Sequence, residues 1–147
     1  MPNSELRASL DSQIAQSSPD SPRLQVAKCI YSFAVDGGVT GLITPKRTQS
    51  LPKNTVIVGG TVNSTGAVTS SGSATLAVGT SAGSSATALL AATAKATLSA
   101  NALVNAVPVF VTPVKLSAAG LITVTVGTAD LTAGVVEITL LYYVANA

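Results

Sequence analysis

Residues 51–80, LPKNTVIVGGTVNSTGAVTSSGSATLAVGT, carry the pattern that decides the fold class. Two runs of alternating apolar and polar residues flank a stretch of Gly, Ser and Thr, and a period of two is typical of half-buried β-strands. The apolar positions that share a face are Val56, Val58 and Val62 in the first run and Ala74, Leu76 and Val78 in the second. Because the residues between the runs are small and polar, we predict a long β-hairpin with a solvated tip.

The chain on either side of this stretch also has strand patterns. Residues 26–35 and 39–44 flank an Asp-Gly-Gly turn and predict a second hairpin. Residues 105–117 predict one strand with prolines near its ends, and residues 121–127 and 135–144 predict two more. The alanine-rich residues 79–103 fit either a short helix capped by a serine or a loop across one end of the fold. About eight strands with at most one helix after residue 25 predict an all-β, jelly-roll-like antiparallel β-sandwich.

The last of these strands is apolar on both faces near its end. Val136, Ile138, Leu140, Tyr142 and Val144 alternate along one face. Leu141 and Tyr143 lie on the other face, where a strand exposed to water would carry polar residues. We therefore expect both sides to be buried there, either by the domain or by a partner, and Leu141 and Tyr143 are candidate partner-binding residues.

Residues 1–25 differ from the rest and are predicted to be an N-terminal arm on a sandwich domain of residues 26–147. Leu6, Leu10 and Ile14 recur at intervals of four, which is typical of one face of a short amphipathic helix. Such a helix has no core of its own, so it must dock on a partner or stay frayed or disordered. Leu6, Leu10 and Ile14 are therefore also candidate partner-binding residues.

The composition favours an assembly component. The chain has 147 residues, which suits one domain, and 47% of them are hydrophobic while only 10% are charged. A surface so poor in charge protects weakly against self-association, so we expect much of it to be covered by other subunits.

The net charge of +2 and the absence of Trp provide neither a strong field nor a stacking platform for nucleic acid, so we expect no nucleic-acid partner. No apolar run approaches the length of a membrane span, and the N-terminus lacks the pattern of a secretory signal, so we expect no membrane contact and synthesis in a cytoplasm.

No catalytic or metal-binding pattern is convincing. Residues 79–83 match the G-x-S-x-G pattern of hydrolases around Ser81, but the chain contains no histidine to act as its base. Cys29 is alone and predicts a small buried residue. The six carboxylates show no metal-ligand or glycosidase spacing. We therefore predict no enzyme activity, no catalytic residue, no metal, no cofactor and no small-molecule substrate.

The order of these features resembles head decoration or cement proteins of tailed bacteriophages. The segments that carry the resemblance are FAVDGG, LPKNTVIVGGTVN, SATLAVGTSAG, PVFVTP and LITVTVGTADLTAG, followed by the aromatic-rich last strand. The resemblance implies a homotrimeric jelly-roll-like protein on the virion's capsid surface, made in the host bacterial cytoplasm, that stabilises the head by bridging major capsid proteins. The alternative is a receptor- or glycan-binding module of a phage tail or head fibre, using residues 63–73 and 79–85 as loops.

Overall fold

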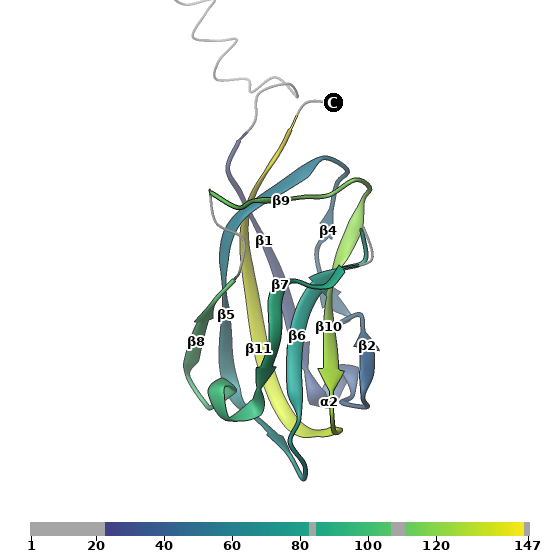
Figure 1. The fold of residues 1–147 in the computed structure, drawn as a ribbon, viewed down its shortest axis with the longest axis vertical. Helices are drawn as coiled ribbons and strands as arrows, with labels where there is room; N and C mark the ends of the chain where they lie inside the picture. Colours follow the sequence, from purple (N-terminus) through teal and green to yellow (C-terminus); the bar gives the residue numbers. More distant parts are fainter. Residues whose placement is uncertain (1–22, 83–84, 107–110, 146–147) are drawn as a thin grey trace, which may run out of the picture.

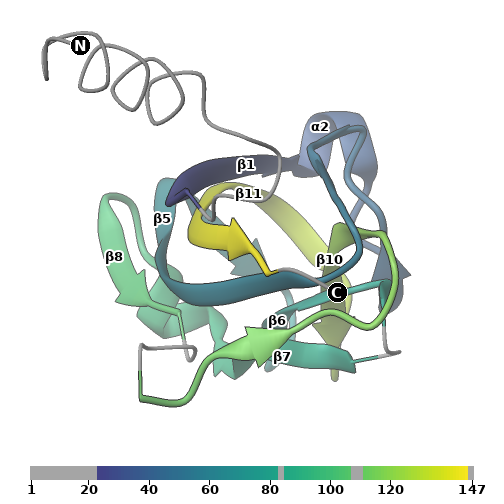
Figure 2. The ribbon, with the colours of Figure 1, turned by 90° about the horizontal axis from the view of Figure 1, so that it is seen from above.

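A computed structural model of the chain describes residues 23–82, 85–106 and 111–145, and these form two β-sheets packed face to face (Figures 1 and 2). The six-stranded sheet has the order β3-β1-β11-β5-β8, with β9 also paired to β5. Its strands are β1 (Gln25–Ser32), β3 (Arg47–Thr48), β5 (Thr55–Ser70), β8 (Ala102–Asn105), β9 (Val114–Lys115) and β11 (Leu131–Val144).

The five-stranded sheet has the order β2-β10-β6-β7, with β4 also paired to β10. Its strands are β2 (Gly41–Ile43), β4 (Ser50–Leu51), β6 (Thr75–Thr80), β7 (Ser85–Ala94) and β10 (Gly120–Gly127). Two short helical turns, α2 (Phe33–Asp36) and η2 (Lys95–Leu98), complete the described elements. Figure 2 shows β1, β11 and β5 as one layer and β6 and β7 in the other.

The strand pairings are nested in the manner of a jelly roll. Eight strands show this nesting, in chain order β1, β2, β5, β6, β7, β8, β10 and β11. The first pairs with the last (β1 with β11), and the second pairs with the seventh (β2 with β10). The third pairs with the sixth (β5 with β8) and the fourth with the fifth (β6 with β7). Every one of these pairs is antiparallel, and this winding is that of a two-sheet jelly roll. The predicted jelly-roll-like antiparallel β-sandwich is confirmed.

The core lies between the two sheets and is made mainly of branched aliphatic side chains. Every second residue is buried in β10 and, from Gly134 to Tyr142, in β11, as the predicted alternation requires, and Thr123 of β10 is buried as well. The largest fully buried side chains are Tyr31, Leu51, Ile57, Leu76, Leu89, Leu98, Ile122, Ile138, Leu140, Val62, Val78 and Val124. Cys29 is fully buried among them, as its place in a strand predicted. Burial raises the pKa of its thiol to about 11.

Both predicted hairpins are wrong. β5 pairs with β11, β8 and β9, whereas β6 pairs with β10 and β7, so residues 51–80 cross from one sheet to the other. Similarly, β1 and β2 lie in different sheets. Alternation fixes which face a side chain occupies but does not identify the neighbouring strand, so two adjacent runs with a turn between them fit a sheet crossing equally well.

The turn between β1 and β2 is organised by Asp36 at the end of α2. Its carboxylate accepts hydrogen bonds from the backbone N–H groups of Ser32 (2.9 Å) and Lys46 (2.8 Å). The hydroxyl of Tyr31 donates to the carbonyl oxygen of Gly37 at 2.6 Å. Burial, followed by the nearby negative charge of Asp36, raises the pKa of Tyr31 to about 12.

One further expectation on the second half of the chain is wrong. Residues 85–94 form the strand β7 rather than a helix or a loop, in keeping with the high β-propensity of their threonines. The strand expected over residues 105–117 falls partly on residues 107–110, which lie outside the described residues; in its described part, β8 ends at Asn105 and β9 holds only Val114–Lys115. The helix expected around Leu6, Leu10 and Ile14 lies outside the described residues.

Candidate interaction surface

The outer face of the six-stranded sheet is the surface that points away from the core. Lys28 of β1 lies opposite Thr139 of β11, which in turn lies opposite Thr61 of β5. The next row holds Ile30 and Glu137. Their neighbours along the strands point inward and belong to the core, so these side chains line the outer face. The outer face is therefore a central strip of β1, β11 and β5 with mixed polar and apolar side chains.

Leu141 and Tyr143, the two candidate residues of the last strand, lie on this outer face and are half-buried. Leu141 lies between Val26 of β1 and Gly59 of β5, and Tyr143 lies opposite Val56. The structure thus brings these two candidates together at one end of the sheet. The other three candidates, Leu6, Leu10 and Ile14, lie outside the described residues.

A hollow of about 400 Å³ indents the outer face and is lined by Gly60, Thr61, Thr139 and Leu141. Its cause is a bulge in β5: Leu141 pairs with Gly59 and Tyr142 pairs with Ile57, so one residue of β5 is unmatched. Gly60 has a φ of +156°, and a β-carbon there would collide with the carbonyl oxygen of Thr139 and with Leu140. Glycine is therefore required at this point, and the absence of a side chain at Gly59, opposite Leu141 on the outer face, leaves that face uncovered beside the hollow.

The bulge also corrects the predicted faces of β5. Ile57 and Val62 both belong to the core although they are five residues apart, which a regular strand would not allow. Val56 lies opposite Tyr143, so it shares the outer face with that side chain. The expectation that Val56 and Val62 point the same way is wrong, because the unmatched residue between them reverses the alternation.

Exposed apolar side chains continue the surface beyond the hollow. Val26, directly opposite Leu141, is 51% exposed, and Leu24, just before β1, is 57% exposed. Figure 1 shows that β1 begins and β11 ends at the same end of the sandwich. The apolar part of the outer face therefore lies where residues 1–22 join the domain.

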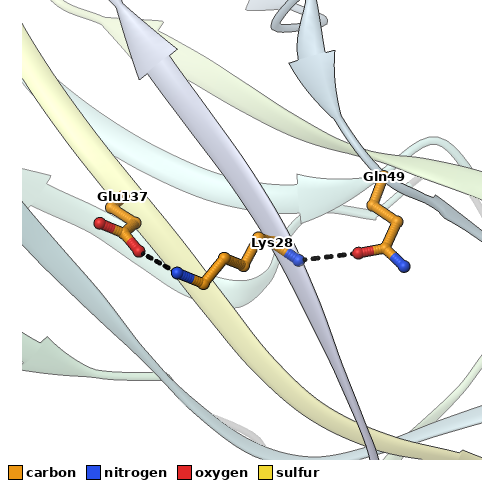
Figure 3. Close-up of polar contacts among 3 residues, drawn as sticks. All are labelled: Lys28, Gln49 and Glu137. Atoms are coloured by element: carbon orange, nitrogen blue, oxygen red, sulfur yellow. Dashed lines mark hydrogen bonds and ion pairs between the residues drawn. The ribbon is translucent and has the colours of Figure 1, made fainter.

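One ion pair joins β1 and β11 on the outer face (Figure 3). Lys28, its cation, lies opposite Thr139, which lines the hollow. Lys28 Nζ lies 2.7 Å from Glu137 Oε1, with the two side chains 59% and 30% exposed. The backbone N–H of Lys28 also donates to Gln49 Oε1 at 3.2 Å (Figure 3). The two charges compensate each other, so this part of the face has polar groups but no net charge.

Ser81, the serine of the hydrolase-like pattern, has a structural role in the described residues. Its Oγ accepts a hydrogen bond from the backbone N–H of Leu121 at 2.8 Å, and its own N–H donates to the carbonyl oxygen of Leu121 at 2.9 Å. The ammonium group of Lys95 donates to the carbonyl oxygen of Ser70 at 2.5 Å. These contacts tie loops to strands and do not activate a nucleophile.

The carboxylates of the described residues also serve local structure. Asp130 accepts hydrogen bonds from the hydroxyl and the backbone N–H of Thr40, at 2.5 and 2.7 Å, and these bonds lower its pKa. Within the described ranges, no three His, Cys, Asp or Glu side chains are close enough together to hold a metal ion. Among those same residues, no helix has the length and apolar character needed to span a membrane.

The sequence pattern alone does not predict the hollow or the exposed residues around it. The signal was present, because two consecutive glycines inside an alternating strand, Gly59 and Gly60, indicate a bulge or a close backbone approach. The sequence predicts Val26 as part of a strand, and the structure places it at the second position of β1 with 51% of its side chain exposed.

Comparison with known proteins gives similarity in structure and not in sequence. No protein-family model and no curated protein matches the chain. Three solved structures are similar: the acidic stable capsid of Helicobacter pylori bacteriophage KHP30, the capsid asymmetric unit of cyanophage Pam1 and the capsid of Ralstonia phage GP4. Their TM-scores are 0.59, 0.60 and 0.57, with sequence identities of 12%, 16% and 21%.

These similarities extend over nearly the whole chain. They cover 84%, 87% and 88% of this chain and 89%, 89% and 90% of the matched chains, in the same order. At such low identities they show that the fold is shared, and they leave the function to be argued separately.

Proposed function

We propose that this chain is a non-enzymatic structural protein of a bacteriophage virion. The observation that carries the proposal is the likeness of almost the entire described sandwich to chains from three phage capsid structures. The low charge and high apolar content support it, because a protein whose surface is covered by neighbours needs few charged residues. The local structural roles of Ser81, Asp36 and Asp130 are consistent with a protein that performs no catalysis.

Within this class, we propose a capsid decoration or cement protein. It would bind the outer surface of the head as a homotrimer and bridge major capsid proteins. A protein that binds only the assembled lattice stabilises it by mass action, by about 2.7 kcal/mol per site when its free concentration is about 100 times the Kd. The outer face around Leu141 and Tyr143, together with the N-terminal segment, is the surface we assign to contacts between copies of this chain within the homotrimer.

The test compares heads assembled with and without this chain. We expect heads that carry the protein to resist heat and low salt better, measured as the temperature at which DNA is released. Heads that bind the protein at full occupancy without any gain in stability would contradict the cement role. Heads that do not bind it at all would contradict a place on the capsid surface.

Deletion of residues 1–22 provides a sharper test, because it leaves the start of β1 at Gln25 and its pairing with Tyr142 intact. We expect binding to heads to weaken while circular dichroism still shows a folded β-sandwich. A matched control is the double substitution Asn3→Ala and Gln13→Ala, which changes the segment but keeps Leu6, Leu10 and Ile14. Equal head binding by the deletion variant and the full chain would exclude a contribution from the segment.

No specific observation favours the receptor- or glycan-binding alternative. Residues 63–70, expected to form one of its loops, belong to β5, and residues 79–80 belong to β6. Binding of the isolated protein to cell-surface glycans in an array would nevertheless favour that alternative over the cement role.

A further inference from the structure

The hollow on the outer face is open among the residues that the structure describes, and its position suggests an occupant. We propose that it receives the apolar side chains of the N-terminal segment, residues 1–22, of a second copy of this chain. The inference concerns how copies of the chain associate with each other. It does not depend on which virion component the assembled protein binds.

The lining of the hollow selects an apolar occupant. Backbone at Gly60, the side chains of two threonines and Leu141 form its walls, and no charged side chain lines it. The nearest charges, Lys28 and Glu137, are paired with each other at 2.7 Å. Burying a charged group in such a site would leave it unpaired, whereas burying an apolar side chain removes its surface from water at no such cost.

The N-terminal segment has matching chemistry. Its large apolar residues after Met1 are Leu6, Leu10 and Ile14, which lie on one face if the segment is helical. The residues between them are mostly polar or charged, so the opposite face suits water. A single apolar stripe of this kind gains stability only when another surface covers it.

The place where the segment joins the domain brings it to the border of the hollow. Arg23 precedes Val26 by three residues, and Val26 lies directly opposite Leu141 in the sheet. The exposed side chains of Leu24 and Val26 extend the apolar surface from the hollow toward this junction. A docked segment would cover both of them as well as the hollow.

The connector favours a second copy over the same chain. Eight residues lie between Ile14 and Arg23, and the nine steps from Ile14 to Arg23 span roughly 30 Å when the chain is fully extended. Pro19 and Pro22 lie in this connector and favour extended backbone, so we expect the connector to extend away from its own domain. Docking on its own hollow would require the connector to turn back against this preference for extended backbone, whereas exchange of identical segments between copies has a low cost.

Disulfide trapping between different chains tests the proposal directly. One chain carries Leu10→Cys and the other carries Thr139→Cys, with tags of different length so that a mixed pair is recognised by mass. The native Cys29 is fully buried and stays in place. The matched control replaces Thr139→Cys with Thr132→Cys, an exposed position seven residues away on β11, or roughly 23 Å along the strand.

We expect the co-expressed pair L10C and T139C to give a mixed covalent dimer at least several-fold more abundant than the control pair. A yield no higher than the control would overturn the proposal. So would a double variant, L10C and T139C in one chain, that forms its disulfide only within the monomer, because the segment would then occupy the hollow of its own chain.

A charge placed in the hollow provides a second readout. We expect Thr139→Arg to lower the mass measured by sedimentation to that of the chain lacking residues 1–22, while Thr132→Arg keeps the wild-type mass. If Thr139→Arg fails to fold, Leu10→Arg makes the same test from the segment's side without altering the sandwich. A monomeric wild-type protein, or a charged variant that associates like wild type, would contradict the exchange.

Discussion

The two faces of strand β11 differ in what they do for the molecule. On the inner face, Val136, Ile138 and Leu140 are completely buried between the sheets. On the outer face, Thr139 and Leu141 are half-buried and border a hollow. The same strand therefore provides the centre of the core on one side and a candidate binding surface on the other. Core packing constrains the inner side chains of β11, whereas its outer side chains are not needed for the core and are available for contacts with other chains.

The largest expected effect separates these two faces. Ile138→Ala removes a fully buried side chain and leaves a cavity, so we expect the free energy of unfolding to fall by about 2 to 5 kcal/mol. Thr139→Ala, the next residue on the opposite face, should change it by less than about 0.5 kcal/mol. Urea denaturation at one protein concentration measures both. Similar losses for the two variants would break the contrast between the faces.

The second effect concerns the bulge that shapes the hollow. Gly60→Ala places a β-carbon against the carbonyl oxygen of Thr139 and keeps a positive φ, so we expect a loss of about 2 to 3 kcal/mol. Gly59→Ala is the matched control, because a β-carbon there meets only Leu141 Cδ1 at 4.0 Å. Thermal unfolding of both variants checks this. A tolerated alanine at residue 60 would mean that the bulge is not fixed by the backbone.

The fold was predictable to the extent that alternation reveals faces. The inner positions of β10 and β11, such as Val124 and Ile138, followed directly from the period of two, and the sandwich class followed from the number of such runs. The pairing of strands was not predictable in the same way. Residues 51–80 contain two good strands with a turn between them, and only long-range contacts decide that each strand pairs in a different sheet.

The candidate surface was predictable only where the strands alternate regularly. Leu141 and Tyr143 were assigned to the outer face by alternation, and the structure places them there. Val56 was assigned to the wrong face relative to Val62, because one unmatched residue in β5 reverses the alternation beyond it. The hollow depends on the same bulge, so a method that assumes regular strands cannot find it even though Gly59 and Gly60 mark the position.

The third prediction tests how completely the inner residues of β1 are shielded from water. Burial raises the pKa of Cys29 from its ordinary value of 9.0 to about 11, and that of Tyr31 from 10.0 to about 12. The unfolded chain loses these protons first as the pH rises, so the unfolding free energy is unaffected below pH 9 and falls above it. Between pH 8 and about 10.5 we expect a loss of about 2 kcal/mol from Cys29 and a smaller one from Tyr31.

Urea denaturation of the wild type and of Cys29→Ala over this pH range measures the effect. In the variant, the unfolding free energy should fall with rising pH only by the smaller amount that comes from Tyr31. Its unfolding free energy at pH 8 should be lower than that of the wild type, because a buried side chain is shortened. Identical pH profiles for the two proteins would mean that water reaches Cys29, and the inner face would then be less closed than the core packing indicates.

The smallest expected effect lies on the outer face. Lys28 and Glu137 form their ion pair at 2.7 Å, but the side chains are 59% and 30% exposed, so water and salt screen the attraction. In a double-mutant cycle with Lys28→Ala and Glu137→Ala, we expect a coupling energy below about 1 kcal/mol that decreases further in 1 M salt. A coupling energy as large as the loss for Ile138→Ala would show that the outer face also holds the sandwich together. A small coupling would leave this pair with a different use: it neutralises the border of the hollow, so that an apolar partner meets no unpaired charge beside it.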